Sequence, residues 1–150
     1  MEKRTANWYV SRRGELLAEQ FLLELQPDSI VASPKDNLAF DFIAIFTKPD
    51  RTPVTIGIEV KTTQHEIGGH FEIKTELALR LLKSNIPVLV IVVDAKTNEI
   101  YFNWIVNAIP PDKQAVLQQY QTCTLQLRRG TKEEIEQLRS ELLGNQLLAV

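Results

Sequence analysis

Three stretches of the chain have apolar residues spaced by three or four positions, which is the period of an α-helix. The first covers residues 11–26 and has Ser11 as its expected N-cap. The second covers residues 74–85, and the third begins at Thr131, whose spacing from Glu134 predicts a capping box. The apolar positions are Ala18, Phe21, Leu22 and Leu25 in the first stretch, Leu77, Leu81 and Leu82 in the second, and Ile135, Leu138 and Leu142 in the third.

The remaining apolar segments have the pattern of β-strands. Residues 39–46 and 54–62 predict two strands joined by a Pro-flanked turn, and residues 86–94 are apolar at successive positions, as in a strand covered on both faces. Shorter strands are expected at residues 29–33, 100–106 and near 123–127, with a short helix after the PPDK sequence. The order helix, three strands, helix, strands, helix predicts a mixed α/β fold. The length of the chain predicts a single domain, residues 1–150.

Composition narrows the class of protein. The 44% hydrophobic and 24% charged content is typical of a soluble globular protein. The longest apolar run, residues 86–93, is far shorter than the roughly 20 residues of a membrane helix, so no membrane partner is expected. The N-terminus has no apolar signal core, and the single cysteine, Cys123, cannot form an internal disulfide. These features favour the cytoplasm.

The formal net charge of −2 gives no overall attraction to nucleic acid, so such a partner would require a local basic patch. One candidate is the N-terminal segment, where basic residues alternate with aromatic ones; a solvated terminus is the alternative. Its members are Lys3, Arg4, Trp8, Tyr9, Arg12 and Arg13. Neither the composition nor the charge decides the oligomeric state, and a homodimer is left open.

Charged residues interrupt the most apolar hairpin, residues 40–64. If its turn centres on Asp50, paired residue numbers sum to 100, so Asp41 lies opposite Glu59 with Cβ atoms about 5 Å apart. Lys61 then points to the same face as Glu59. Two ionised carboxylates at this spacing repel by roughly 3 kcal/mol at an effective dielectric of 20. Either one carboxyl group is protonated or a cation lies between them, unless the three residues form a purely structural network.

These residues resemble the PD-(D/E)xK nuclease superfamily, in which an aspartate precedes a strand that ends in Glu-x-Lys, here Glu59-Val60-Lys61. More closely, the sequences GELLAEQFL, FDFIAI, IEVKTT and NIPVLVIVVD…EIYFNWI resemble the bacterial domain of unknown function 4365, over residues 13–106. The resemblance implies a restriction-endonuclease-like α/β fold with an α-β-β-β-α-β core. Its mixed central sheet would have about four to six strands flanked by helices.

The resemblance also implies a role for each matching residue. Asp41 and Glu59 would bind magnesium or manganese together with the carbonyl of Val60, and Lys61 would position or activate the attacking water. Glu15 would complete the metal shell from the first helix, and Gln64 would add a polar side chain beyond the motif. The implied activity is metal-dependent hydrolysis of phosphodiester bonds in nucleic acid, with DNA as the expected substrate.

Two other functions remain open. Related sequences tend to read D-x-G-x-D before the apolar strand, whereas this chain has Asn37 and Ala39 at the first acidic and the glycine positions. This departure favours a catalytically silent domain that binds nucleic acid or a partner protein in a defence or mobile-element system. The second possibility is an interaction protein that uses the amphipathic C-terminal helix. Glu15 is equally compatible with an ion pair to Arg12, and His65 and His70 with an exposed turn.

Overall fold

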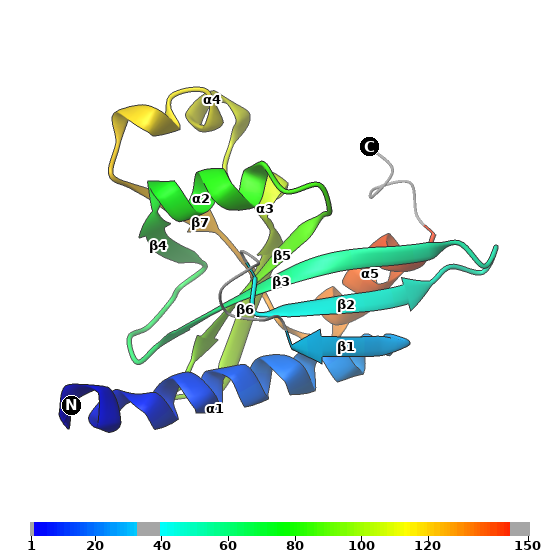
Figure 1. Ribbon diagram of the computed structural model, residues 1–150, viewed down its shortest axis with the longest axis horizontal. Helices are drawn as coiled ribbons and strands as arrows, with labels where there is room; N and C mark the ends of the chain where they lie inside the picture. The colour runs from blue at the N-terminus through cyan, green and yellow to red at the C-terminus, as the bar shows by residue number, and fades with distance from the viewer. Residues whose placement is uncertain (1, 33–39, 145–150) are drawn as a thin grey trace.

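The computed structural model describes residues 2–32 and 40–144, with side chains from Trp8 onward. It is a mixed α/β structure, as the hydrophobic pattern predicts (Figure 1). The helices are α1 (Glu2–Glu24), α2 (Thr75–Leu82), α3 (Ile105–Ala108), α4 (Pro111–Gln114) and α5 (Lys132–Leu143), with a 3₁₀ turn at Leu117–Gln119. The strands are β1 (Ser29–Ala32), β2 (Phe42–Thr47), β3 (Pro53–Thr63), β4 (His70–Lys74), β5 (Val88–Asp94), β6 (Glu99–Trp104), β7 (Thr122–Gln126) and β8 (Arg128–Arg129).

The central sheet has six strands in the order β1-β2-β3-β5-β6-β8. Strands β3 and β5 are parallel, and the other neighbouring pairs are antiparallel. The connection between the two parallel strands carries β4 and α2. Strand β4 pairs instead with β7 in a separate two-stranded sheet. The predicted mixed sheet with an α-β-β-β-α-β element order is therefore present, with one strand inserted before α2.

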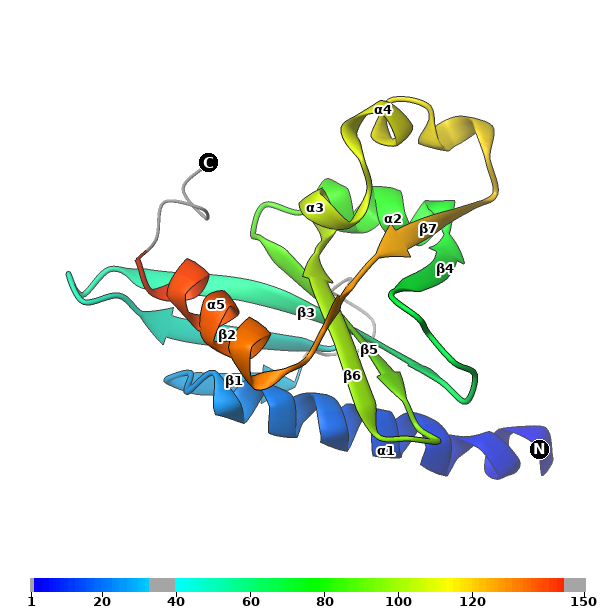
Figure 2. The ribbon, with the colours of Figure 1, turned by 180° about the vertical axis from the view of Figure 1, so that it is seen from behind.

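Two apolar cores lie on the two faces of the central sheet (Figures 1 and 2). On one face, α1 and α5 pack against alternate residues of β2, β3 and β5, such as Ile58 and Ile91. On the other face, α2 and α3 pack against Val88, Val90 and Val92 of β5. Every residue of β5 is buried, which confirms the prediction that both faces of this strand are covered. No helix within residues 2–32 and 40–144 is long and apolar enough to cross a membrane.

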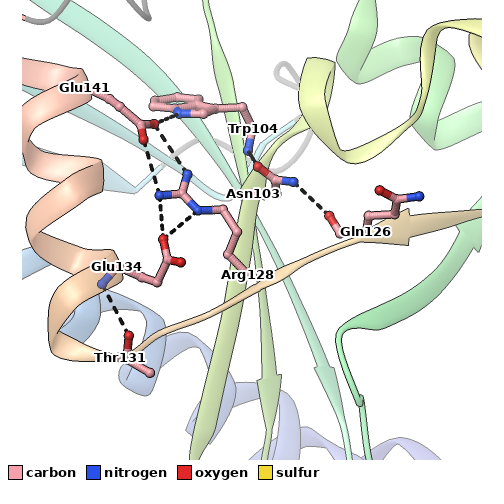
Figure 3. A network of polar contacts seen from close by, with 7 residues as sticks. All are labelled: Asn103, Trp104, Gln126, Arg128, Thr131, Glu134 and Glu141. Carbon is pink, nitrogen blue, oxygen red and sulfur yellow. Dashed lines mark hydrogen bonds and ion pairs between the residues drawn. The ribbon is translucent and has the colours of Figure 1, made fainter.

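A polar network fixes α5 to the sheet (Figure 3). The side chain of Thr131 accepts a hydrogen bond from the amide of Glu134, which confirms one half of the predicted capping box; the Glu134 carboxylate pairs with Arg128 and not with the amide of Thr131. Arg128 donates to the carboxylates of both Glu134 and Glu141, and the indole N–H of Trp104 donates to Glu141. Leu138 and Leu142 are fully buried in the first core. The apolar stripe of α5 is thus used inside the fold, which removes it as an exposed docking face for a partner.

Two predicted boundaries were wrong, and one strand was missed. Ser11 lies inside α1, which begins at Glu2, because the preceding residues contain no Gly or Pro that would stop the helix. Strand β4 was missed because it pairs with β7, about fifty residues away, and such a pairing leaves little local signal. Residues 105 and 106 belong to α3 and not to the end of β6.

Candidate active site

The hairpin of β2 and β3 has the register expected from the sequence. Phe42 pairs with Ile58, Thr47 pairs with Pro53, and the residue numbers of every pair between them sum to 100. The turn is closed by a hydrogen bond from the amide of Lys48 to the carbonyl of Thr52. Because the side chains of a strand alternate between faces, this register fixes which residues of β3 share a face.

Asp41 lies just beyond the last ladder pair, where the regular pairing changes. Its amide donates to the carbonyl of Ile58 at 2.7 Å, although Ile58 is already opposite Phe42. Two consecutive residues therefore face one residue, as in a β-bulge. The carboxylate of Asp41 accepts a hydrogen bond from the amide of Val60 at 2.7 Å. The expectation that Asp41 lies directly opposite Glu59 is thus corrected: Asp41 sits at the edge of β3 and takes the place of a main-chain partner.

This arrangement also orients the carbonyl of Val60. In an extended strand, the N–H and C=O of one residue point to the same neighbouring strand. Since the N–H of Val60 points to Asp41, its carbonyl also faces the edge where β2 has ended. Two oxygen-bearing groups, the Asp41 carboxylate and the Val60 carbonyl, therefore lie along one edge of β3.

Glu59 is the buried acid of the site, with 7% of its surface exposed. Its neighbours Ile58 and Val60 pack into the core under α1, so the Glu59 side chain points to the α2 face of the sheet. Burial, and after it the negative charge of Asp41, raise the pKa of Glu59 from its ordinary value to about 7. The positive charges of Lys61 and Arg80 act in the opposite direction. The charge of Asp41 is therefore close enough to disfavour the ionisation of Glu59.

Lys61 shares the face of Glu59, two residues further along β3. Its ammonium nitrogen lies 3.6 Å from a carboxylate oxygen of Glu59, and 38% of its side chain is exposed. The lysine is thus anchored to the buried acid while it remains accessible from solvent. Its charge lowers the pKa of Glu59, but burial and the charge of Asp41 outweigh this effect.

The donor set fits a hard divalent cation. Magnesium prefers oxygen ligands and is commonly held by one or two carboxylates together with water and substrate phosphate. Asp41, Glu59 and the carbonyl of Val60 supply only oxygen, and burial together with the charge of Asp41 keeps the pKa of Glu59 raised despite the nearby Lys61. These residues therefore meet the chemical requirements of the metal that the sequence resemblance implies.

Glu15, in contrast, is not brought to this cluster. Glu15 lies on α1 with its carboxylate 3.5 Å from Arg12, and α1 covers the opposite face of the sheet from Glu59. Within the described ranges, no three His, Cys, Asp or Glu residues are grouped closely enough to bind a metal, so Glu15 does not join Asp41 and Glu59. Gln64 is the first residue after β3 and is exposed. Asn37 and Ala39 lie outside the described residues.

Two residues near the site were missed by sequence reasoning. A side chain on Gly57 would lie 2.8 Å from the ring of Phe40, so only glycine leaves room for that ring beside β3. Phe40 directly precedes Asp41, which makes this contact part of what positions the acid. The signal was a glycine inside a strand, which often marks a close approach. Arg80 of α2 gave no signal, because its proximity to Glu59 depends on how α2 crosses the sheet.

The weaker candidates behave as ordinary residues. His65 and His70 are both exposed, as predicted for the turn around Gly68 and Gly69. Cys123 is half-buried, and its burial raises the pKa of the thiol, which disfavours a reactive thiolate.

A scan against protein-family models found no match to this chain, and a search of curated proteins found no relative.

Proposed function

We propose that this protein is a magnesium-dependent nuclease with a restriction-endonuclease-like fold, related to the PD-(D/E)xK superfamily and to the bacterial domain of unknown function 4365. It would hydrolyse phosphodiester bonds, with DNA as the expected substrate and the cytoplasm as its location. The observation that supports this proposal most is buried Glu59, whose pKa the neighbouring Asp41 helps to raise and whose carboxylate lies 3.6 Å from the ammonium of Lys61. The element order and the hairpin register agree with the same interpretation.

Asp41, Glu59 and the carbonyl of Val60 would hold the metal ion, either magnesium or manganese. When bound, the divalent ion supplies a Lewis acid for the scissile phosphate and lowers the pKa of its water. The amide of Val60 orients the carboxylate of Asp41, and burial holds Glu59 in a fixed position. The ammonium of Lys61 projects from the same face and stabilises the negative charge that develops on the phosphate oxygens during attack.

Cleavage assays test the proposal. Labelled single- and double-stranded DNA and RNA are incubated with the purified chain in magnesium, in manganese and in EDTA. We expect cleavage only with a divalent ion, and a loss of at least about 100-fold in Lys61→Ala, since one electrostatic donor to a transition state typically contributes this much. Metal binding should persist in Lys61→Ala, because the lysine acts on water and phosphate.

The matched control is Lys83→Ala, which removes an exposed lysine at the C-cap of α2 and should leave the rate unchanged. Cleavage that persists in EDTA, or that is unchanged in Lys61→Ala, contradicts the mechanism. Binding of nucleic acid without cleavage of any of these substrates would instead identify the catalytically silent alternative.

A further inference from the structure

A row of exposed apolar side chains runs along the outer side of α1. Tyr9, Leu16 and Leu23 are 58%, 50% and 60% exposed, which is unusual for large apolar residues on a well-formed helix. They are seven residues apart, which is close to two helical turns, so they form one stripe. Together with the neighbouring Trp8, α1 carries four of the seven large exposed apolar side chains in the described part of the chain.

The stripe lies opposite the buried side of α1. The residues that pack into the core are Ala18, Phe21, Leu22 and Leu25. Helix α1 is therefore apolar on two opposite faces, and only one of these faces is covered by the sheet. A solvent-exposed helix face normally carries polar residues throughout, so the second apolar face indicates a contact with another molecule.

The charges beside the stripe are arranged in two halves. Arg12 and Arg13 lie between Tyr9 and Leu16, whereas Glu19 and Gln20 lie between Leu16 and Leu23. If two α1 helices pair antiparallel with Leu16 at the centre, Arg12 of each copy comes next to Glu19 of the other. A parallel pair would instead place Arg12 next to Arg13 of the second copy, which is repulsive. The antiparallel arrangement is thus the one that the charges favour.

We infer that the stripe Tyr9–Leu16–Leu23 is a homodimer interface, in which α1 of one copy packs antiparallel against α1 of a second copy. At the two-fold axis Leu16 meets Leu16 of the second copy, and Tyr9 meets Leu23. A nucleic acid fits this face less well, because two of its three side chains are leucines, which offer no stacking surface, and Glu19 would repel phosphate.

The dimer leaves both candidate active sites accessible. Helix α1 covers one face of the sheet and α2 the other (Figure 1), and the side chain of Glu59 points to the α2 face, because its neighbours Ile58 and Val60 pack under α1. The exposed stretch from Trp8 to Glu24 is only about 24 Å long at 1.5 Å per residue. A contact along a single helix of this length is at the low end of specific interfaces, so we expect a dissociation constant in the micromolar range.

Sedimentation equilibrium of the full chain, over a concentration series through the micromolar range, tests the interface. We expect a reversible monomer–dimer equilibrium in the wild type. Leu16→Glu should raise the dissociation constant about 30-fold or more, because it brings two carboxylates together at the two-fold axis. The control Val106→Glu changes an apolar residue of similar exposure, Val106 of α3, which is 58% exposed, and should leave the equilibrium unchanged.

A charge exchange tests the antiparallel register. Arg12→Glu and Glu19→Arg should each weaken the dimer, and the double variant should recover wild-type affinity. Within one chain Arg12 pairs with Glu15, so recovery in the double variant requires a contact between copies. A wild type that stays monomeric, a dimer unaffected by Leu16→Glu, or single variants whose effects simply add would each overturn the inference. A monomer in which Leu16→Glu lowers DNA binding would overturn it too, and would assign the stripe to nucleic acid.

Discussion

Two regions of this protein bury a glutamate beside a basic side chain, and they treat it differently. Glu141 of α5 is 6% exposed and accepts hydrogen bonds from the indole of Trp104 at 2.9 Å and from Arg128 at 3.2 and 3.4 Å (Figure 3). Glu59 of β3 is 7% exposed, and within the described residues its ion-pair partner is Lys61, whose ammonium nitrogen lies 3.6 Å from the carboxylate. The two glutamates are almost equally buried, but Glu141 has several close hydrogen-bond donors, whereas Glu59 has one more distant donor.

The difference separates a structural charge from a candidate functional one. Around Glu141 the guanidinium of Arg128 also bonds Glu134 and lies 4.7 Å from the centre of the Phe102 ring, so the cluster is satisfied and joins α5 to β6 and β8. Buried polar groups are normally satisfied in this way, because an unmatched one costs free energy. The second acid beside Glu59 increases that cost, which a bound cation would offset.

The largest expected effect on stability concerns the satisfied cluster. Arg128→Met keeps much of the side-chain volume but leaves Glu141 buried without its counter-charge. Removing one partner of a buried ion pair costs about 3 kcal/mol or more of unfolding free energy. Urea unfolding measures the loss. Arg129→Met is the control, because Arg129 pairs with Glu99 near the surface and should contribute less than about 1 kcal/mol. Equal losses in the two variants would contradict the structural role of Arg128.

At Glu59 we expect the opposite: removing the charge should raise the free energy of unfolding. Its pKa is about 7 in the folded protein against about 4.5 when exposed, so folding favours the protonated form. Below pH 4.5 Glu59 is protonated in both the folded and the unfolded protein, and burying it costs least. As the pH rises from 4.5 through 7, the unfolded protein releases this proton more easily than the folded protein, so the free energy of unfolding falls. Glu59→Gln mimics the protonated acid. At pH 8 and without divalent ions, the variant should be about 2–3 kcal/mol more stable than wild type, with little difference at pH 4.

Chemical unfolding of both proteins across this pH range gives the comparison. Glu141→Gln is the matched change in the satisfied cluster and should lower stability at pH 8, because it weakens the bonds to Arg128. If Glu59→Gln is also destabilising at pH 8, Glu59 belongs to a structural network and the contrast between the two regions fails.

A smaller effect is expected at Gly57, which holds the candidate site in shape. In Gly57→Ala the new methyl group would lie 2.8 Å from the ring of Phe40, which must move and take Asp41 with it. We expect a loss of about 1–2 kcal/mol in stability and weaker magnesium binding by calorimetry. Gly14→Ala is a control on the other face of the sheet, where the methyl group would overlap Thr62. It should destabilise the fold and leave magnesium affinity unchanged, so equal losses of affinity in both variants would contradict a positioning role for Gly57.

The sequence predicted the hairpin register because strand side chains alternate strictly and the turn around Asp50 is short. It could not predict the bulge at Asp41, since that depends on which main-chain groups Phe42 and Ile58 have already satisfied. The network around Arg128 was also beyond reach, because it joins residues of β6, β8 and α5 through tertiary packing. The role of Glu15 could not be decided from the sequence either. Its position on the helix was compatible both with an ion pair to Arg12 and with a place in the metal site.

The central claim is that Asp41 and Glu59 form a metal site, and magnesium-linked unfolding of wild type and Asp41→Asn tests it most directly. Asparagine keeps an oxygen that can accept the hydrogen bond from Val60, so the variant loses the charge and little else. Without metal it should be about 1–2 kcal/mol more stable than wild type, because the repulsion of Glu59 is relieved. At a magnesium concentration 100 times the dissociation constant, wild type should gain about 2.7 kcal/mol and the variant almost nothing. A wild type that magnesium does not stabilise, together with a variant less stable than wild type, would contradict the claim.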